Sequence, residues 1–320
     1  MELSFTSLFA GLGILTAGIV AAATIDTILP FLRPSQLQRY LYSRNGKPAW
    51  ALVTGASDGI GKAFSHELAS KGFNVVLHGR NPAKLQKVKQ ELQTAFPQRD
   101  FRILIADATR CDPKIFEDIA DQLADLHITL VVSNAGASTA TGPGGTGSLE
   151  SQTLQTVADG VNLNVVFPTM LVRTLLPLLP KDGPAFIVIV GSMADFGFPL
   201  LASYGASKSY LNVFAKALGR EMRLTRPNIE TIYLRLSSTT GVSHTWGPPS
   251  LFKPHSTTMA KAALARIGCG RPVIAPYWPH AILSVITELL PRGVQDDVFG
   301  KEMLKLQREG LNPEDKTKST

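Results

Sequence analysis

The 320-residue chain has little of what marks disulfide-linked, metal-binding or nucleic-acid-binding proteins. Its only two cysteines, Cys111 and Cys269, lie far apart in the sequence, so we expect no disulfide framework. Its six histidines lack the paired spacing of a metal site. The formal net charge is +7, yet no run of lysine and arginine is interleaved with aromatic residues, so nucleic acid is not an expected partner. With 44% hydrophobic residues, the chain is long enough for one large domain with its own core.

Charged side chains are also missing from residues 3–25, a length that crosses the hydrocarbon core of a membrane as a helix. A cleaved signal peptide is one alternative, because "VAAAT" offers small residues, but the segment before it holds Glu2 and neither lysine nor arginine. A segment that lies in the membrane plane is another. Four basic residues follow the span with no acid among them: Arg33, Arg39, Arg44 and Lys47. The positive-inside rule then predicts that residues 1–47 are a transmembrane anchor and basic linker, and that the following domain is cytoplasmic.

Between Trp50 and about Ile232, short apolar runs alternate with amphipathic stretches. The runs lack the polar–apolar alternation of half-exposed strands, so we expect strands that are buried on both faces. Two of the stretches begin with an N-cap residue followed by proline, Asn81-Pro82 and Asp112-Pro113, which is a helix-start signal. Buried strands separated by helices predict the α/β class, with a Rossmann-type doubly wound parallel sheet.

The end of the chain is less regular. Residues 241–279 are punctuated by proline and glycine around one helix, "TMAKAALARIG", and an apolar or amphipathic helix, "HAILSVITELLP", follows. We expect Ala281 to Leu290 to dock on a bilayer, to cap an apolar substrate tunnel, or to pack as an ordinary lid. The chain is thus divided into the anchor and linker, a main domain at 48–300 with a substrate lid at 241–300, and a polar tail at 301–320. We expect the end of this tail, 309–320, to be disordered.

A glycine-rich turn follows the first predicted strand directly. In "TGASDGIG", Gly55, Gly59 and Gly61 let the backbone turn sharply, and a helix begins inside the motif. The amides at a helix N-terminus bind phosphate, so the turn predicts a dinucleotide site; a simple tight turn between strand and helix is the alternative.

The end of the second predicted strand, "VVLHGRN", bears on which dinucleotide is bound. An acidic residue there would bind the adenosine ribose and repel a 2′-phosphate, whereas this segment has none and offers Arg80 to a phosphate. This favours NADP(H) over NAD(H). Two observations keep the other cofactor open: Arg80 could face water, and Asp58 lies within the glycine turn, where it could disfavour the phosphate.

These pieces combine into a pattern that resembles the short-chain dehydrogenase/reductase family. The pattern consists of "TGASDGIG", Asp107 after the third strand, "SNAG", Asn164, Ser192 and "YGASK", and it covers Trp50 to about Leu236. The resemblance implies a catalytic group of Asn164, Ser192, Tyr204 and Lys208. Together with the glycine turn, it gives the expected cofactor contacts: Gly55, Ser57, Asp58, Gly59, Ile60, Gly61, Arg80, Asp107, Asn134, Ala135, Gly136, Tyr204, Lys208, Ser237 and Thr239.

Tyr204 and Lys208 lie four residues apart and hence on one face of a helix. A free tyrosine titrates at about pH 10, and we expect the lysine ammonium, with an oxidised nicotinamide close by, to lower the pKa of Tyr204. Tyr204 would then protonate a carbonyl oxygen as hydride arrives, and Ser192 would hydrogen-bond the same oxygen. By resemblance, Asn164 helps to hold the lysine and a proton-relay water, with Asn162 as the rival for that role.

Two further features depart from the family's pattern. The spacing from Ser192 to Tyr204 is one residue shorter than in many members, and Gly191 stands where a second serine is common. The segment from Ser237 to Thr240 replaces the usual Pro-Gly. That segment normally contacts the nicotinamide amide, so these contacts are in doubt here, although the serine and threonine hydroxyls could replace them.

The N-terminal anchor, the start "WALVTGASDGIGKA" and the C-terminal apolar helix are similar to a narrower branch, the very-long-chain 3-oxoacyl-CoA reductases and 17β-hydroxysteroid dehydrogenases of the endoplasmic reticulum. Lys316 and Lys318 in "KTKST" resemble a dilysine retrieval signal. We therefore expect an enzyme of the endoplasmic reticulum membrane, with a cytosolic domain, that uses NADPH to reduce a long-chain 3-oxoacyl-CoA.

Three expectations stay open beside this one. A steroid, retinoid or polyketide-type ketone is the alternative substrate. A non-catalytic NADP(H)-binding membrane scaffold is the alternative function. Members of the family often pair through the helices that hold Asn164 and Tyr204, so a homodimer is a further expectation.

Overall fold

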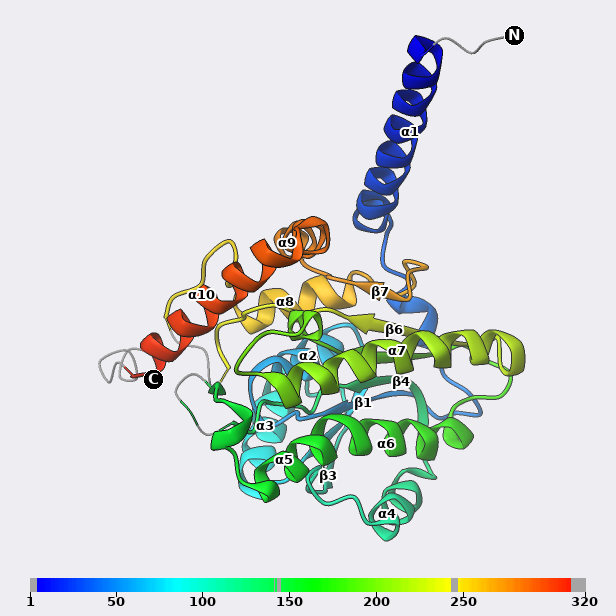
Figure 1. Ribbon diagram of the computed structural model, residues 1–320. Helices are drawn as coiled ribbons and strands as arrows, with labels where there is room; N and C mark the ends of the chain where they lie inside the picture. The colour runs from blue at the N-terminus through cyan, green and yellow to red at the C-terminus, as the bar shows by residue number, and fades with distance from the viewer. Residues whose placement is uncertain (1–4, 141, 143–144, 243–246, 312–320) are drawn as a thin grey trace.

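The computed structural model describes residues 5–140, 142, 145–242 and 247–311. A single helix, α1 (Phe5–Leu32), projects from one side of an α/β domain that contains the remaining elements (Figure 1). The linker after α1 includes a short 3-10 helix, η1 (Leu37–Tyr40), and leads directly into the first strand of the sheet.

Within the described residues, seven parallel strands form one sheet in the order β3-β2-β1-β4-β5-β6-β7. They are β1 (Ala49–Thr54), β2 (Asn74–Gly79), β3 (Phe101–Ile105), β4 (His127–Ser133), β5 (Ala185–Val190), β6 (Ile229–Leu234) and β7 (Val273–Ile274). Every residue of β1, β2, β4 and β5 is buried, which explains why their sequences do not alternate between polar and apolar residues. The predicted Rossmann-type fold is confirmed.

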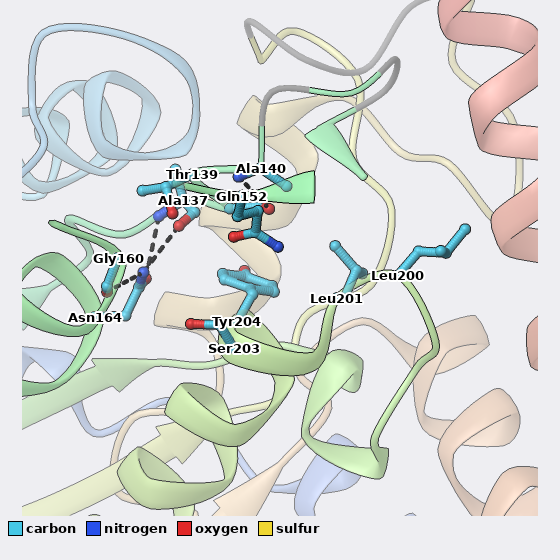
Figure 2. Close-up of a pocket in the computed structure, with 11 residues that line it drawn as sticks. Ala137, Thr139, Ala140, Gln152, Gly160, Asn164, Leu200, Leu201, Ser203 and Tyr204 are labelled. Atoms are coloured by element: carbon cyan, nitrogen blue, oxygen red, sulfur yellow. Dashed lines mark hydrogen bonds between the residues drawn. The ribbon is translucent and has the colours of Figure 1, made fainter. Parts of the chain in front are cut away.

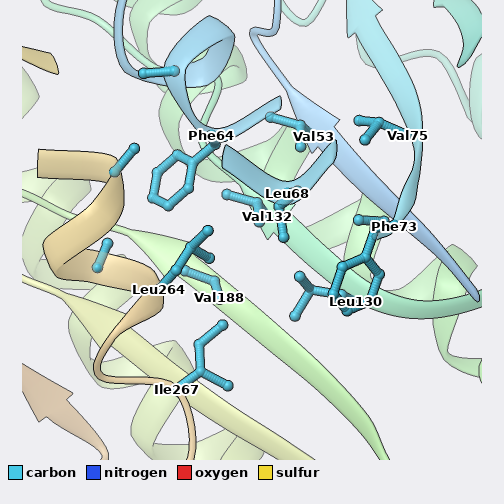
Figure 3. Close-up of a cluster of buried hydrophobic side chains, with 14 of the residues drawn as sticks. Val53, Phe64, Leu68, Phe73, Val75, Leu130, Val132, Val188, Leu264 and Ile267 are labelled. Atoms are coloured by element: carbon cyan, nitrogen blue, oxygen red, sulfur yellow. The ribbon is translucent and has the colours of Figure 1, made fainter. Parts of the chain in front are cut away.

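One face of the sheet is covered by α2 (Gly59–Ser70), α3 (Pro82–Ala95) and α8 (Ser256–Leu264). Figure 3 shows part of this core, in which Phe64 and Leu68 of α2 and Leu264 of α8 lie against the strand residues Val132 and Val188. The predicted N-cap of α3 is present, because the Asn81 side chain accepts a hydrogen bond from the Lys84 amide at 3.0 Å.

The opposite face is covered by α4 (Pro113–Leu123), α5 (Leu154–Val161), α6 (Phe167–Leu175) and α7 (Ala202–Thr225). The predicted cap of α4 is also present, since Asp112 accepts from the Lys114 amide at 2.8 Å. A π-helical turn, η4 (Asn162–Val166), joins α5 to α6, and such turns are frequent at functional sites.

Among the described residues, the helical stretch Leu154–Leu178 is long and apolar enough to cross a membrane, but Phe167, Leu171 and Leu175 within it are buried in the core of the domain. A shorter apolar stretch, Phe9–Gly18, lies in α1. These tests of length and composition therefore leave the membrane anchor as a proposal.

The C-terminal region departs most from its sequence-based description. The short strand β7 extends the sheet, and α9 (Trp278–Leu289) is followed by α10 (Arg292–Leu311), which runs without a break across residue 300. Residues 309–311 are therefore helical, although we expected disorder there. The rest of that tail, with Lys316 and Lys318, lies outside the described residues.

Candidate active site

The candidate site lies where the sheet's strands end. Two adjoining hollows, with volumes of about 540 Å³ and about 390 Å³, share Gly136, Ala137 and Ser138 in their walls. The larger hollow is lined by Gly55, Arg80 and other residues at the ends of β1, β2 and β3, and the smaller one by residues from the ends of β5 and β6 and from α7 and α10. Together they form an elongated cleft at the carboxyl ends of the strands, where ligands bind in open α/β sheets.

The glycine turn forms one end of this cleft. Gly55 and Gly59 have φ angles of +67° and +55°, which side chains with a Cβ rarely adopt. A Cβ on Gly61 would lie 2.1 Å from the carbonyl oxygen of Gly55, so only glycine fits there. Asp58 caps α2 by accepting a hydrogen bond from the Gly59 amide at 2.7 Å. The glycines therefore bring the backbone and the N-terminus of α2 to the cleft, and Asp58 has a structural role there.

The predicted adenosine-side residues meet in the larger hollow. Ser57, Arg80 and Asp107 all contribute to its wall. The Asp107 carboxylate accepts hydrogen bonds from the Thr109 amide at 3.0 Å and the Thr109 hydroxyl at 2.9 Å. Burial by itself would raise the pKa of Asp107, but these hydrogen bonds and the nearby Arg80 guanidinium lower it below its usual value. Asp107 is therefore a carboxylate at neutral pH, held next to a cationic side chain.

The turn after β4 joins the two hollows. The Asn134 amide group donates to the Thr54 carbonyl at 2.9 Å, and the backbone amides of Asn134 and Ala135 both donate to the Thr54 hydroxyl at 2.8 Å. A Cβ on Gly136 would lie 2.8 Å from Asn164 Oδ1 and 2.9 Å from Lys208 Nζ. Glycine at position 136 thus lets these two side chains approach the same stretch of backbone.

The structure distinguishes the two candidate asparagines. Asn164 is buried at the cleft: its side chain accepts from the Ala137 amide at 3.1 Å and donates to the carbonyls of Ala137 and Gly160 (Figure 2). Asn162 instead donates to the Thr109 carbonyl at 2.9 Å. The π-helical turn that contains both residues therefore directs Asn164, and not Asn162, to the cleft wall next to Tyr204.

Tyr204 and Lys208 lie on one face of α7, as their spacing predicts. Lys208 Nζ is 5.5 Å from the centre of the Tyr204 ring and donates a hydrogen bond to the Val190 carbonyl at 3.1 Å. Burial lowers the pKa of Lys208 to about 8, although the Asp195 carboxylate opposes this effect. The ammonium is therefore buried beside the phenol ring, and it titrates close to physiological pH.

The pKa of Tyr204 is raised by the protein's own groups, whereas the expected decrease included an oxidised nicotinamide beside the ring and stays a prediction for that complex. Burial, which disfavours the phenolate, raises its pKa above the usual value, and the Asp195 carboxylate adds to the increase. The nearby Ser192 hydroxyl opposes the increase but does not overcome it. Tyr204 is therefore a protonated phenol at neutral pH.

Tyr233, on β6, is a site residue that the sequence did not reveal. A Cβ on Gly191 would lie 1.9 Å from Cζ of the Tyr233 ring, which explains why no second serine precedes Ser192. The fully buried Tyr233 hydroxyl accepts a hydrogen bond from the Ser192 amide at 3.2 Å and donates to the Lys208 carbonyl at 3.1 Å. It thus links the backbones of two predicted catalytic residues.

A buried ion pair lies beside this group and was also missed. Arg235 Nε is 3.1 Å from Asp195 Oδ2, and the two side chains are only 11% and 1% exposed. Asp195 belongs to η6 (Met193–Phe196), the 3-10 turn that Ser192 caps. The same guanidinium donates to Ser284 and Glu288 of α9, at 2.9 Å and 2.6 Å. The sequence does contain a sign of this ion pair: Arg235 lies inside the apolar run "IYLRL", and a buried arginine requires an acidic partner.

The remaining wall comes from the C-terminal part of the chain. Met303 and Leu306 of α10 line the smaller hollow, and the rings of Phe299 and Phe198 pack with their centres 4.2 Å apart. Ile60, Ser237 and Thr239 line the same hollow. The segment from Ser237 to Thr240, which replaces the usual Pro-Gly, therefore does reach the cleft. Helix α10, which the sequence analysis assigned in part to a polar tail, forms one wall of the cleft. Across the described ranges, no group of three or more metal-binding side chains occurs.

Comparison with known proteins agrees with this geometry. A family model described as short chain dehydrogenase matches residues 49–246. A very-long-chain 3-oxoacyl-CoA reductase-like protein of Arabidopsis thaliana is 31% identical over 270 residues, covering 83% of this chain and 82% of its own. The very-long-chain 3-oxoacyl-CoA reductase of Pyricularia oryzae is 29% identical over 249 residues, covering 74% of this chain and 72% of its own.

Solved structures show the same fold. A short-chain dehydrogenase from Sphingobium yanoikuyae in complex with NADPH superposes with a TM-score of 0.59 and 22% identity, covering 76% of this chain and 97% of its own. The family acts as oxidoreductases on CH–OH and keto groups, and the similar curated proteins are ketoreductases by name. The chain therefore belongs to the short-chain dehydrogenase family.

Proposed function

We propose that this protein is a membrane-anchored, NADPH-dependent reductase of long-chain 3-oxoacyl-CoA. The observation that carries the proposal is the meeting of Ser192, Tyr204 and Lys208 at one hollow, with Asn164 in the adjoining wall. The substrate class rests on the names of the curated relatives, which this chain matches over most of its length.

The residues of the cleft fit a dinucleotide. The close approach of Gly61 to Gly55 leaves no room for a side chain, and it brings the amides at the N-terminus of α2 to the hollow. Arg80, which is exposed at the hollow's wall, is the candidate partner for a 2′-phosphate. Asp58 is engaged in capping α2, which reduces the objection that its charge would repel that phosphate. A bound NADPH would supply the hydride.

Tyr204 is suited to be the acid of the reduction. Its raised pKa keeps the proton on the phenol until the substrate oxygen becomes basic. Proton transfer to that oxygen leaves a phenolate, which the ammonium of Lys208, 5.5 Å from the ring centre, stabilises. Ser192 lines the same hollow as Tyr204, and we propose that its hydroxyl donates to the same oxygen.

Asn164 fixes the geometry on the other side of the group. Its amide group donates to the carbonyls of Ala137 and Gly160, and its oxygen and the Lys208 ammonium both lie next to Gly136. We propose that it holds the Gly136 segment in place so that the lysine can approach.

The anchor is part of the same proposal. Helix α1 carries exposed apolar side chains at Phe9, Ile14 and Leu15, away from the sheet's core. Burial of such a surface in lipid would tether the domain to a membrane, which we propose to be that of the endoplasmic reticulum, with the domain on the cytosolic side. Pairing of two copies through α6 and α7 is proposed as well; α7 exposes Tyr210 and Val213.

A substrate panel tests the reaction. Membranes that contain the full chain are incubated with NADPH or NADH and with 3-oxoacyl-CoA of several lengths or with ketosteroids. We expect NADPH oxidation that increases with acyl length and disappears in Tyr204→Phe. Activity on ketosteroids with none on any acyl-CoA would replace the proposed substrate by a steroid-type ketone. Binding of NADPH with no turnover of any ketone would leave a membrane scaffold.

A further inference from the structure

Helix α9 has its apolar side outward. Trp278, Ile282, Val285, Ile286 and Leu289 recur at helical spacing on one face, and all are exposed; Leu289 is 78% exposed. This is the reverse of a helix that packs on a soluble domain, which buries its apolar stripe. An exposed, continuous apolar face of this kind marks a surface with a missing partner.

The inner face of α9 is held to the domain by polar contacts. Ser284 accepts from Arg235 at 2.9 Å, His280 lies 3.1 Å from the Phe252 carbonyl, and the Thr287 carbonyl accepts from Gln295 at 2.9 Å. His280, Ser284 and Thr287 are all buried. The helix therefore cannot turn its apolar face inward without breaking these contacts and exposing the Arg235–Asp195 pair.

The apolar face is continuous with the base of α1. Thr27, Pro30 and Phe31 of α1 line one hollow together with Val285 and Glu288 of α9. Figure 1 shows α9 at the side of the domain from which α1 projects. The base of α1 is fixed there, because Arg266 donates to the Pro30 carbonyl and its guanidinium lies 5.0 Å from the centre of the Phe31 ring.

Exposed cationic side chains flank the same side. Arg33 follows the last residue of α1, and Arg292 begins α10 directly after α9. The acidic residue on α9, Glu288, is paired with Arg235 at 2.6 Å. Lys216 and Arg271 also line the hollow between Val285 and the base of α1. These cations favour anionic headgroups as the partner of the face.

We propose that the exposed face of α9 lies in the headgroup–acyl boundary of the bilayer that α1 crosses. The inference rests on the proposed anchoring by α1 and adds a second, in-plane contact. Two contacts fix the orientation of the domain on the membrane, which a single flexible tether does not do. Helix α10, which follows α9 directly, places Met303 and Leu306 in the wall of the hollow that also contains Tyr204.

Fluorescence of the unmodified chain provides the first test. The full protein is reconstituted into phosphatidylcholine vesicles containing phosphatidylserine, with or without bromine on the acyl chains, and is compared with Trp278→Phe. We expect brominated lipid to quench wild-type emission clearly more than that of Trp278→Phe. Equal quenching of the two proteins would place Trp278 in water and overturn the proposal.

Labelled single cysteines separate this inference from the anchor itself. In a Cys111→Ser, Cys269→Ala background, a fluorophore is placed at Leu15→Cys on α1, Ile286→Cys on α9 or Leu154→Cys, an exposed apolar control on α5. We expect lipid-borne quenchers to reach Leu15 and Ile286, and aqueous iodide to reach Leu154. If the lipid quenchers reach the label at Leu15 but not the label at Ile286, the α9 proposal is overturned and the anchor stands. The same holds if neither the lipid quenchers nor iodide reach Ile286, because a second copy then covers that face. Iodide access at Leu15 would overturn the anchor.

Discussion

The ring of Tyr233 occupies the space that a side chain at Gly191 would need. A residue on β6 therefore requires glycine at the position that directly follows β5. Close packing of this kind leaves no room for even one methyl group. Because Ser192 follows Gly191 directly, the contact also determines where the proposed catalytic serine is placed.

Gly191→Ala tests the packing. We expect a loss of about 3 kcal/mol or more in the free energy of unfolding, because the added methyl overlaps a fully buried ring. Urea denaturation of the full chain in detergent gives the value. In a Tyr233→Ala background the same change should cost much less, so that the double-mutant cycle yields a large coupling energy. Equal costs in the two backgrounds would show that the ring does not set the constraint.

Tyr233→Phe tests the hydroxyl separately from the ring. The change keeps the packing but removes the acceptor for the Ser192 amide and the donor to the Lys208 carbonyl. We expect kcat/KM for ketone reduction to fall about tenfold, the equivalent of roughly 1.4 kcal/mol for lost hydrogen bonds near the reacting oxygen. Tyr42→Phe, which removes a hydrogen bond to the Pro184 carbonyl outside the cleft, is the control and should leave kcat/KM unchanged. A similar kcat/KM for both variants would contradict the prediction.

Lys208→Met should make the protein more stable and nearly inactive. The folded pKa of Lys208, about 8, is below that of an unfolded lysine, so the folded state bears the cost of a buried ammonium below pH 8. This cost disappears as the pH rises from about 8 towards 10.5, and wild-type stability should increase over that window.

Stability measured against pH checks the sign of this effect. Removal of the ammonium should raise the unfolding free energy at pH 7 by something on the order of 2 kcal/mol, and the gain should shrink towards pH 10. Lys216→Met, on the same helix, is the control. A Lys208→Met protein that is less stable than wild type at pH 7 would mean that the ammonium contributes more to folding than its burial costs.

Strands β1 to β6 could be predicted because each carries its own signal, whereas the two-residue strand β7 could not. Runs such as "AFIVIV" are apolar throughout, and the caps Asn81 and Asp112 are local. The glycine turn and the Tyr204–Lys208 pair are local as well, so their positions at the cleft followed from the sequence.

The missed features depend on contacts between distant segments or on burial. Tyr233 reaches Gly191 across 42 residues, and no pattern in either segment reveals the other. Helix α10 has a polar composition, yet Met303 and Leu306 face the cleft.

Cofactor choice is the last feature that a single residue can test. Arg80 lines the larger hollow and lies close enough to Asp107 to lower the pKa of that carboxyl, and we propose that its guanidinium binds the 2′-phosphate. In Arg80→Ala, we expect the Kd for NADPH to rise at least about tenfold while that for NADH changes little, because only the phosphate loses a charged partner. Arg110→Ala, which removes a second cation near Asp107 that does not line the hollow, is the matched control. Calorimetric titration of both variants decides: if Arg80→Ala leaves the ratio of the two affinities unchanged, the preference for NADPH must come from another part of the cleft.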